Sequence, residues 1–292
     1  MYRRVVTHYD RCAILFIVDC SLSMRNLTRF GTTEMSKIEV ASLIVNHMID
    51  DLVARATRGI NVRDYYDIGV IGYSGYEAYS MLPGDDTVFK RVVRLVEDSP
   101  QPKYVYLNCQ SVDGDIRSMP YLIHPWIEPE ASGASPMYDA FTMARNVAKQ
   151  WCNDPRNKTS FPPLIFHISD GLPSDADDVE LRAIAEEIMA LGMPKGKSLL
   201  FNIYLATADE GDLSIEIYPE SRLFYPYDSE REFTFTLSSF LPEHLESYVF
   251  RTLRPNTRPP YRAAAFNTSP ISLLSIINVG TMLYEPFVPV KY

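Results

Sequence analysis

Four short segments built mainly from apolar residues constrain the fold of this chain more than any other feature. A strand that is covered on both faces has a nearly continuous apolar sequence, whereas a strand with one face in water alternates apolar and polar residues. The four segments are nearly continuous, and we therefore predict that they are strands buried on both faces. They are residues 13–18, 67–73, 163–168 and 198–205.

Much of the chain between these segments has apolar residues at the spacing of a helix. Apolar residues recur at helical spacing over residues 37–55, 137–151 and 177–191, as they do on the buried face of a helix. Alternating strands and helices predict parallel strands joined by right-handed crossovers. We therefore predict an α/β fold with a doubly wound, mostly parallel sheet flanked by helices.

Local signals refine this prediction. Ser36 has the spacing of a capping box with the glutamate three residues later, and Ser174 has the same spacing with Asp177. The segment around Tyr121 to Trp126 adjoins or contains prolines. Because proline cannot donate to a strand ladder, this segment is predicted to be one short antiparallel edge strand.

One enlarged domain is expected for a chain of 292 residues with 46% hydrophobic content. A helix is predicted from Glu243 to about Arg251, and a further short helix over residues 271–278. The apolar, proline-rich end of the chain has two interpretations: a strap over its own domain, or an arm that docks on another chain. The predicted parts are a domain at 10–250, a long insertion within it around 75–130, and a C-terminal extension at 251–292.

Five tyrosines of the insertion also have two interpretations. They form a recognition surface, since exposed tyrosine is favoured in interfaces, or they pack over an edge of the core. They are Tyr76, Tyr79, Tyr104, Tyr106 and Tyr121.

Oxygen-bearing side chains stand at the ends of two predicted strands and before one predicted helix. The loops at the carboxyl edge of a parallel sheet lie together, and ligands bind there. Carboxylate and hydroxyl oxygens suit a hard divalent cation; Mg2+ is the default in a cytosol, with Mn2+ or Ca2+ as alternatives. Two carboxylates and three hydroxyls leave a coordination position for an acidic group of a partner. The predicted metal ligands are Asp19, Ser21, Ser23, Ser135 and Asp170.

Parts of this pattern also have a purely structural interpretation. Ser135 precedes a proline, which is a common helix start, and Asp170 precedes a glycine, which is a common turn. Ser21 and Ser23 are not expected to cap a helix, because the next predicted helix has its own capping residue, Ser36. The combination favours the metal site.

In order and in residue type, the three loops resemble the metal-ion-dependent adhesion site of von Willebrand factor type A (VWA) domains. The resemblance covers about residues 10–250. Leu22 departs from the glycine often found there, and residues 25–35 lengthen the rim of the site. The matching segments are Asp19-Cys20-Ser21-Leu22-Ser23, Gly133-Ala134-Ser135-Pro136-Met137 and Ser169-Asp170-Gly171-Leu172-Pro173-Ser174-Asp175.

The resemblance implies a Rossmann-like VWA fold in which the five residues hold the metal, some of them through water. It also implies a non-enzymatic module for metal-dependent protein–protein interaction, to which another protein supplies the acidic group. The chain looks most similar to stand-alone cytosolic VWA proteins of bacterial tellurite-resistance-type stress and phage-defence operons, which accompany a phosphatase and a kinase. Two alternatives remain: an assembly subunit of a MoxR-type AAA+ ATPase, and a metal-assisted hydrolase.

Composition and motifs argue against several other classes. The net charge of -9 speaks against a nucleic-acid surface. The chain has no apolar run of membrane length and no leader pattern, and its four cysteines lack metal-ligand spacing. A cytoplasmic protein with free thiols is therefore expected. The segment from Gly72 to Tyr76 nearly matches a nucleophile elbow but lacks its last glycine, and His167 is expected to be a satisfied core residue.

Overall fold

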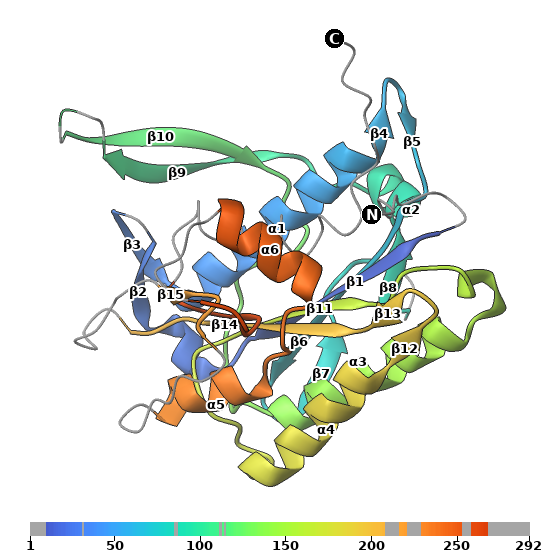
Figure 1. Ribbon diagram of the computed structural model, residues 1–292. Helices are drawn as coiled ribbons and strands as arrows, with labels where there is room; N and C mark the ends of the chain where they lie inside the picture. The colour runs from blue at the N-terminus through green and yellow to red at the C-terminus, as the bar shows by residue number, and fades with distance from the viewer. Residues whose placement is uncertain are drawn as a thin grey trace.

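The computed structural model describes residues 10–30, 32–84, 87–110, 113, 115–207, 216–220, 229–252 and 258–267. Over these residues the chain forms an eight-stranded central sheet (Figure 1). Its strands are β1 (Cys12–Asp19), β6 (Tyr66–Ser74), β7 (Glu77–Ser80), β8 (Phe89–Arg91), β11 (Leu164–Ser169), β14 (Leu199–Tyr204), β15 (Glu216–Ile217) and β16 (Ala264–Phe266). Their order is β15-β16-β14-β11-β1-β6-β7, and β8 also pairs with β6.

The centre of the sheet is parallel, as the apolar segments predicted. β6, β1, β11, β14 and β16 are parallel neighbours, whereas β7, β8 and β15 pair antiparallel. Every residue of β1 is buried, which explains its unbroken apolar sequence up to Asp19. From β1 the chain moves to β6 on one side and returns to β11 on the other, so the topological switch point lies between β1 and β11.

Helices cover both faces of the sheet, which completes the predicted doubly wound α/β fold (Figure 1). One face packs against α1 (Lys37–Ala56), α2 (Val92–Glu97) and α6 (Glu243–Thr252). The other packs against α3 (Met137–Asn153), α4 (Asp178–Ala190) and α5 (Ser229–Leu237). Successive side chains of β1 point to opposite faces of the sheet, so they alternate between the core under α1 and the core under α3.

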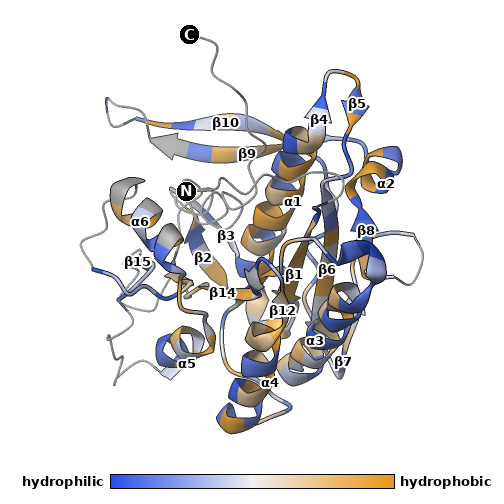
Figure 2. Cartoon of the chain, turned by 45° about the vertical axis from the view of Figure 1, so that its right-hand side comes forward, coloured by the Kyte–Doolittle hydropathy of each residue, from blue (hydrophilic) through white to orange (hydrophobic). Residues whose placement is uncertain are grey.

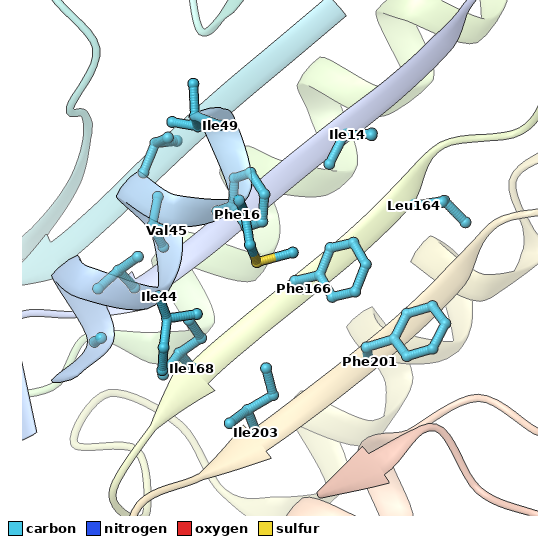
Figure 3. Close-up of a cluster of buried hydrophobic side chains, with 14 of the residues drawn as sticks. Ile14, Phe16, Ile44, Val45, Ile49, Leu164, Phe166, Ile168, Phe201 and Ile203 are labelled. Carbon is cyan, nitrogen blue, oxygen red and sulfur yellow. The ribbon is translucent and has the colours of Figure 1, made fainter. Parts of the chain in front are cut away.

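Aromatic rings form the centre of the core between the sheet and α1, which we call the α1 core. Phe16 stacks on Phe166 with ring centroids 5.7 Å apart, and Phe166 stacks on Phe201 at 4.8 Å. Figure 3 shows the three rings in a row across β1, β11 and β14, with Ile44 and Val45 of α1 to their left. This row fixes α1 on the sheet and thereby positions its first residue near the end of β1.

A separate hairpin lies over α1. β9 (Lys103–Gln110) pairs antiparallel with β10 (Ile116–Ile123), and the ribbon projects from the body of the molecule in Figure 1. Tyr121 of β10 forms a hydrogen bond with His47 of α1. Because α1 is covered by both the sheet and the hairpin, it is largely hydrophobic in Figure 2.

The prediction of a short antiparallel strand at Tyr121 to Trp126 is confirmed for Tyr121–Ile123, which belong to β10, but this strand pairs in the hairpin and not at the edge of the central sheet. A two-stranded ribbon leaves one side of each strand unpaired, so Pro120 is tolerated there. The antiparallel edge beside β6 is β7. Short ribbons complete the described strands: β2 (Leu27–Phe30) with β3 (Thr33–Ser36), β4 (Thr57–Arg58) with β5 (Asn61–Val62), and β12 (Gly192–Met193) with β13 (Gly196–Lys197).

The helix starts confirm one predicted capping box and correct the other. Ser36 Oγ accepts the N–H of Glu39 at 3.3 Å, and Ser36 N donates to Glu39 Oε2 at 2.8 Å. At α4, however, the cap is Asp177, whose box partner lies three residues later. Ser174 is not the cap because its hydroxyl accepts the N–H of Ser135 at 3.0 Å.

The sheet extends beyond the domain boundary predicted at residue 250. β16 lies between β14 and β15, so part of the predicted extension at 251–292 belongs to the fold. The helix predicted from Glu243 to about Arg251 is α6. The helix predicted over 271–278 and the terminal arm lie outside the described residues. Within the part of the chain that the structure describes, every helix is too short or too polar to span a bilayer.

Candidate metal centre

The three predicted loops meet at the switch point between β1 and β11. Asp19 ends β1, and Asp170 directly follows β11. Ser135 precedes α3, and its Oγ donates to Asp19 Oδ2 at 3.2 Å. Ser23 Oγ donates to Asp170 Oδ1 at 2.8 Å and lies 3.0 Å from Ser21 Oγ. Because Ser21 N also donates to Asp19 Oδ1, all five predicted residues lie in one cluster of hydrogen bonds.

Asp19 shapes the first loop. Its Oδ1 accepts the backbone N–H of Ser21 at 2.8 Å, which is an Asx turn that bends the chain away from β1. A 3-10 turn follows over Leu22–Arg25, and Ser21 at its N-cap position makes no side-chain capping bond. The hydroxyl of Ser21 is thus used within the cluster and not for capping.

Backbone contacts hold the second loop against the first. Leu22 N donates to Gly133 O at 2.9 Å, and Ser132 N donates to Cys20 O at 2.8 Å. Gly133 has a φ of +70°, and a Cβ on it would lie 2.7 Å from the Cα of Gly75. Only glycine at 133 allows the turn after β6 and the loop before α3 to touch backbone to backbone.

Ser135 does not cap α3. The helix begins at Met137, Pro136 stands at the N-cap position, and no side-chain capping bond is formed there. The hydroxyl of Ser135 goes to Asp19 instead. The structural interpretation of this serine is therefore wrong, because the loop geometry turns its side chain towards the end of β1.

Burial dominates the electrostatics of the cluster. Asp19 is 1% exposed, and burial raises its pKa to about 6 against hydrogen bonds from Ser21 and Ser135 that lower it. The negative charge of Asp170 adds to the rise. Two neighbouring buried carboxylates favour a cation beside them.

A buried lysine that the sequence patterns did not mark belongs to the same cluster. Lys37 Nζ donates to Asp170 Oδ2 at 2.9 Å, and both side chains are 3% exposed. Lys37 is the first residue of α1. A cation in the first turn of a helix opposes the helix dipole, and this local conflict is the sequence signal that could have identified it.

The oxygen donors fit a hard divalent cation. Two carboxylates and three hydroxyls match the ligand preference of Mg2+. Among the described residues, no three His, Cys, Asp or Glu side chains gather as metal ligands, so a metal at Asp19 would depend on the serine hydroxyls. Lys37 does not fit this set of metal ligands, because its ammonium group is a positive charge that already pairs with Asp170.

The rim of the cluster exposes apolar side chains. Leu22 is 54% exposed, Leu172 is 42% exposed and Tyr76 is 98% exposed. A cavity of about 480 Å³ lies beside the first two loops; its lining includes Arg25, Ser36, Glu39, Glu130 and Ser132. A polar centre with exposed apolar side chains around it is suited to contact with another protein.

The five insertion tyrosines divide between the two interpretations. Tyr76, Tyr104 and Tyr106 are exposed, as a recognition surface requires. Tyr121 is partly buried against the α1 core, and the partly buried Tyr79 Oη lies 3.4 Å from the Oγ of a serine at the end of β6. Only the first three therefore remain candidates for recognition.

A buried row of hydrogen bonds begins at Tyr73, the register partner of Asp19 on β6. Tyr73 Oη lies 2.8 Å from His167 Nε2, and His167 Nδ1 lies 2.8 Å from Asn202 Oδ1. Asn202 Nδ2 in turn donates to Ser238 Oγ at 3.1 Å. These partners assign the hydrogen to Nδ1 and make Nε2 an acceptor. His167 is therefore a satisfied core residue, as predicted.

We expect His167 to make the protein less stable in mild acid. Burial lowers its pKa from 6.5 to about 4. Between these values the unfolded chain binds a proton that the folded chain does not, so the free energy of unfolding falls by about 3 kcal/mol from pH 6.5 down to pH 4. Above pH 6.5 this contribution is fully present. Asp19, whose pKa is raised to about 6, changes stability in the opposite direction over this range, so the test is the difference between two proteins. Urea unfolding at both ends of the range should show that the wild type loses about 3 kcal/mol more stability than His167→Gln; equal changes in the two proteins would contradict the prediction.

The near match to a nucleophile elbow is not an elbow in the structure. That motif places its serine on a sharp turn between a strand and a helix. Here Ser74 ends β6, and the next element is the antiparallel strand β7. The serine is thus part of a β-hairpin.

Comparisons with known proteins give matches among solved structures alone. No protein-family model matches the chain, and no curated protein matches it. A solved von Willebrand factor type A protein from Catenulispora acidiphila matches 67% of this chain and 33% of its own, with 12% identity and a TM-score of 0.39. Proximal thread matrix protein 1 from the mussel byssus matches 96% of this chain and 48% of its own, with 13% identity and a TM-score of 0.43.

A third match is an uncharacterized membrane spanning protein from Vibrio fischeri, at 12% identity and a TM-score of 0.29, over 67% of this chain and 71% of that one. The chain thus spans a third to about half the length of the first two solved proteins. TM-scores of this size carry no argument about either fold or function. The fold and the cluster themselves define the class: a doubly wound α/β protein with carboxylates and hydroxyls gathered at its switch point.

Proposed function

We propose that this chain is a non-enzymatic interaction module whose Asp19 cluster binds Mg2+ and, through the metal, an acidic residue of another protein. The observation that carries the proposal is the cluster at the switch point, where oxygen atoms from three separate loops are joined by hydrogen bonds. Ligands bind at this place in open α/β sheets.

The donor set favours binding over catalysis. Metal-dependent hydrolysis usually draws on several carboxylates around one or two ions to make a nucleophilic water. Asp19 and Asp170 are the two carboxylates of this cluster, and the remaining donors are neutral hydroxyls. A metal held by few anions keeps strong attraction for a further carboxylate, which a partner would supply.

The exposed apolar side chains around the cluster support a protein as the partner. Leu22, Leu172 and Tyr76 are exposed around the cluster and offer apolar contacts next to the charged centre. Buried apolar contacts around a polar anchor are what give an interface its affinity. From the resemblance of the loops, we propose a cytosolic bacterial stress or defence system as the setting, with a kinase or phosphatase of that system as the partner.

Capture from a lysate of the host tests the proposal. The tagged protein is used as bait in Mg2+, in EDTA, and as Asp19→Ala in Mg2+. We expect a protein that is retained in Mg2+ and released by both EDTA and the substitution. Retention of the same proteins in all three conditions would show that the interface does not depend on the metal.

Two surface variants separate the rim from the metal in the same experiment. Tyr76→Ala is expected to lose the captured protein while it still binds Mg2+. Ile60→Ala is the matched control, because Ile60 is also 98% exposed but lies in the turn between β4 and β5. Equal capture by both variants would exclude Tyr76 from the interface.

A further inference from the structure

The cluster already contains a cation of its own. Lys37 Nζ lies 2.9 Å from Asp170 Oδ2, with both side chains 3% exposed. Ser23 Oγ donates to the other oxygen of the same carboxylate at 2.8 Å. Both oxygens of Asp170 are therefore occupied by donors from the chain.

Stability alone is a poor explanation for this lysine. Lys37 is the first residue of α1, where the positive end of the helix dipole repels a cation. Its ammonium group has also left water, and a buried ion pair often returns no more than this desolvation costs. A position that is unfavourable on two grounds points to a task in the site.

We propose that Lys37 is a built-in cation that competes with the divalent metal for Asp170, so that the metal binds only when it displaces the ammonium group. This inference rests on the proposed function and adds its regulation. A divalent ion near Asp170 would lie within a few ångströms of Nζ, where two positive charges repel strongly in a buried site. The ion pair and the metal therefore exclude one another.

The displaced ammonium would need other acceptors near the start of α1. The cavity of about 480 Å³ beside the loops is lined by Ser36 and Glu39, which flank Lys37 in sequence, and by Glu130 and Arg25. The proposal requires the lysine side chain to swing from Asp170 towards these carboxylates when metal binds. Without metal, Lys37 neutralises Asp170; with metal, the site gains charge and becomes attractive to an acidic partner.

Mn2+ titration followed by electron paramagnetic resonance tests the competition in the intact chain. Lys37→Met removes the ammonium and keeps much of the volume, and we expect it to bind Mn2+ at least about tenfold more tightly than the wild type. Mg2+ should also raise the melting temperature of this variant more than that of the wild type, because its metal-free form has two uncompensated carboxylates.

Lys195→Met is the matched control. Lys195 pairs with Asp10 at the same distance of 2.9 Å, and Asp10 lies before β1, at the end of the strand opposite to Asp19. This variant makes the same change of charge and should leave Mn2+ affinity unchanged. Lys37→Gln, whose amide still donates a hydrogen bond, replaces Lys37→Met if circular dichroism shows that the latter does not fold.

The outcomes separate this inference from the proposed function. Equal or weaker Mn2+ binding by the Lys37 variants, with clear binding by the wild type, overturns the competition and leaves the metal site standing. Absence of Mn2+ binding in both the wild type and the Lys37 variants overturns the metal site, and the competition with it. Tighter binding in Lys195→Met as well would assign the effect to net charge and overturn the competition.

Discussion

Asp19→Ala is expected to weaken Mg2+ or Mn2+ binding by about 100-fold or more, since removal of even a supporting residue around a metal costs 10–100-fold. Asp19 is one of the two carboxylates of the cluster and accepts hydrogen bonds from Ser21 N and Ser135 Oγ. Its loss would therefore remove the charge of a proposed ligand and the turn that aims the first loop. Isothermal titration calorimetry of the purified protein measures the effect.

Two further substitutions make this prediction specific. Asp67→Ala is the control, because Asp67 is also buried but lies near the start of β6, where it accepts from Trp151 Nε1 at 2.8 Å; this variant should keep its metal affinity. Asp19→Asn removes a buried negative charge next to Asp170, and it should raise the metal-free stability by roughly 1–3 kcal/mol. Metal binding by Asp19→Asn at wild-type strength would contradict the assignment of Asp19 as a ligand.

Gly133→Ala is expected to lower the free energy of unfolding by about 2–5 kcal/mol and to abolish metal binding. Gly133 has a φ of +70°, which an alanine adopts only with strain. The new Cβ would also lie 2.7 Å from Gly75 Cα and 2.8 Å from Gly75 N. Since both neighbours are backbone atoms, the loop that carries Ser135 must move away from Asp19. Urea unfolding and Mn2+ titration give the two readouts.

Gly59→Ala separates strain from collision. Gly59 has a similar φ of +61° and no atom within 4 Å of an added Cβ, so its substitution carries the conformational cost alone, about 1 kcal/mol. The excess loss in Gly133→Ala then measures the contact with Gly75. Similar losses of stability in the two variants, with metal binding intact in both, would show that the loops do not depend on this contact.

The strands and the meeting of the three loops were predictable because they depend on short-range patterns. A fully buried strand such as β1 needs an unbroken apolar sequence, and loops at the carboxyl edge of parallel strands meet whatever their side chains are. Asp19 and Asp170 could therefore be brought together from sequence alone, whereas Ser135 precedes a helix and was assigned from the pattern of its loop. The VWA resemblance pointed to the same residues.

Long-range contacts explain what could not be predicted. Lys37 reaches Asp170 across 133 residues, and the spacing of neither residue reveals the partner. Ser174 looked like a helix cap, but its hydroxyl bonds to Ser135 N from a distant loop. Tyr121 fitted an edge strand of the main sheet by its prolines, although it pairs with Val105 in the hairpin and bonds to His47 of α1. In each case a tertiary partner overrides the local signal.

Crystals grown with Mn2+ would test the metal site most directly, through an anomalous difference map. We expect one peak at the Asp19 cluster, with carboxylate and serine oxygens at about 2.2 Å and with Lys37 Nζ moved away from Asp170. A map without a peak, in crystals where Lys37 still donates to Asp170 and the five side chains keep their hydrogen bonds, would contradict both the metal site and its regulation.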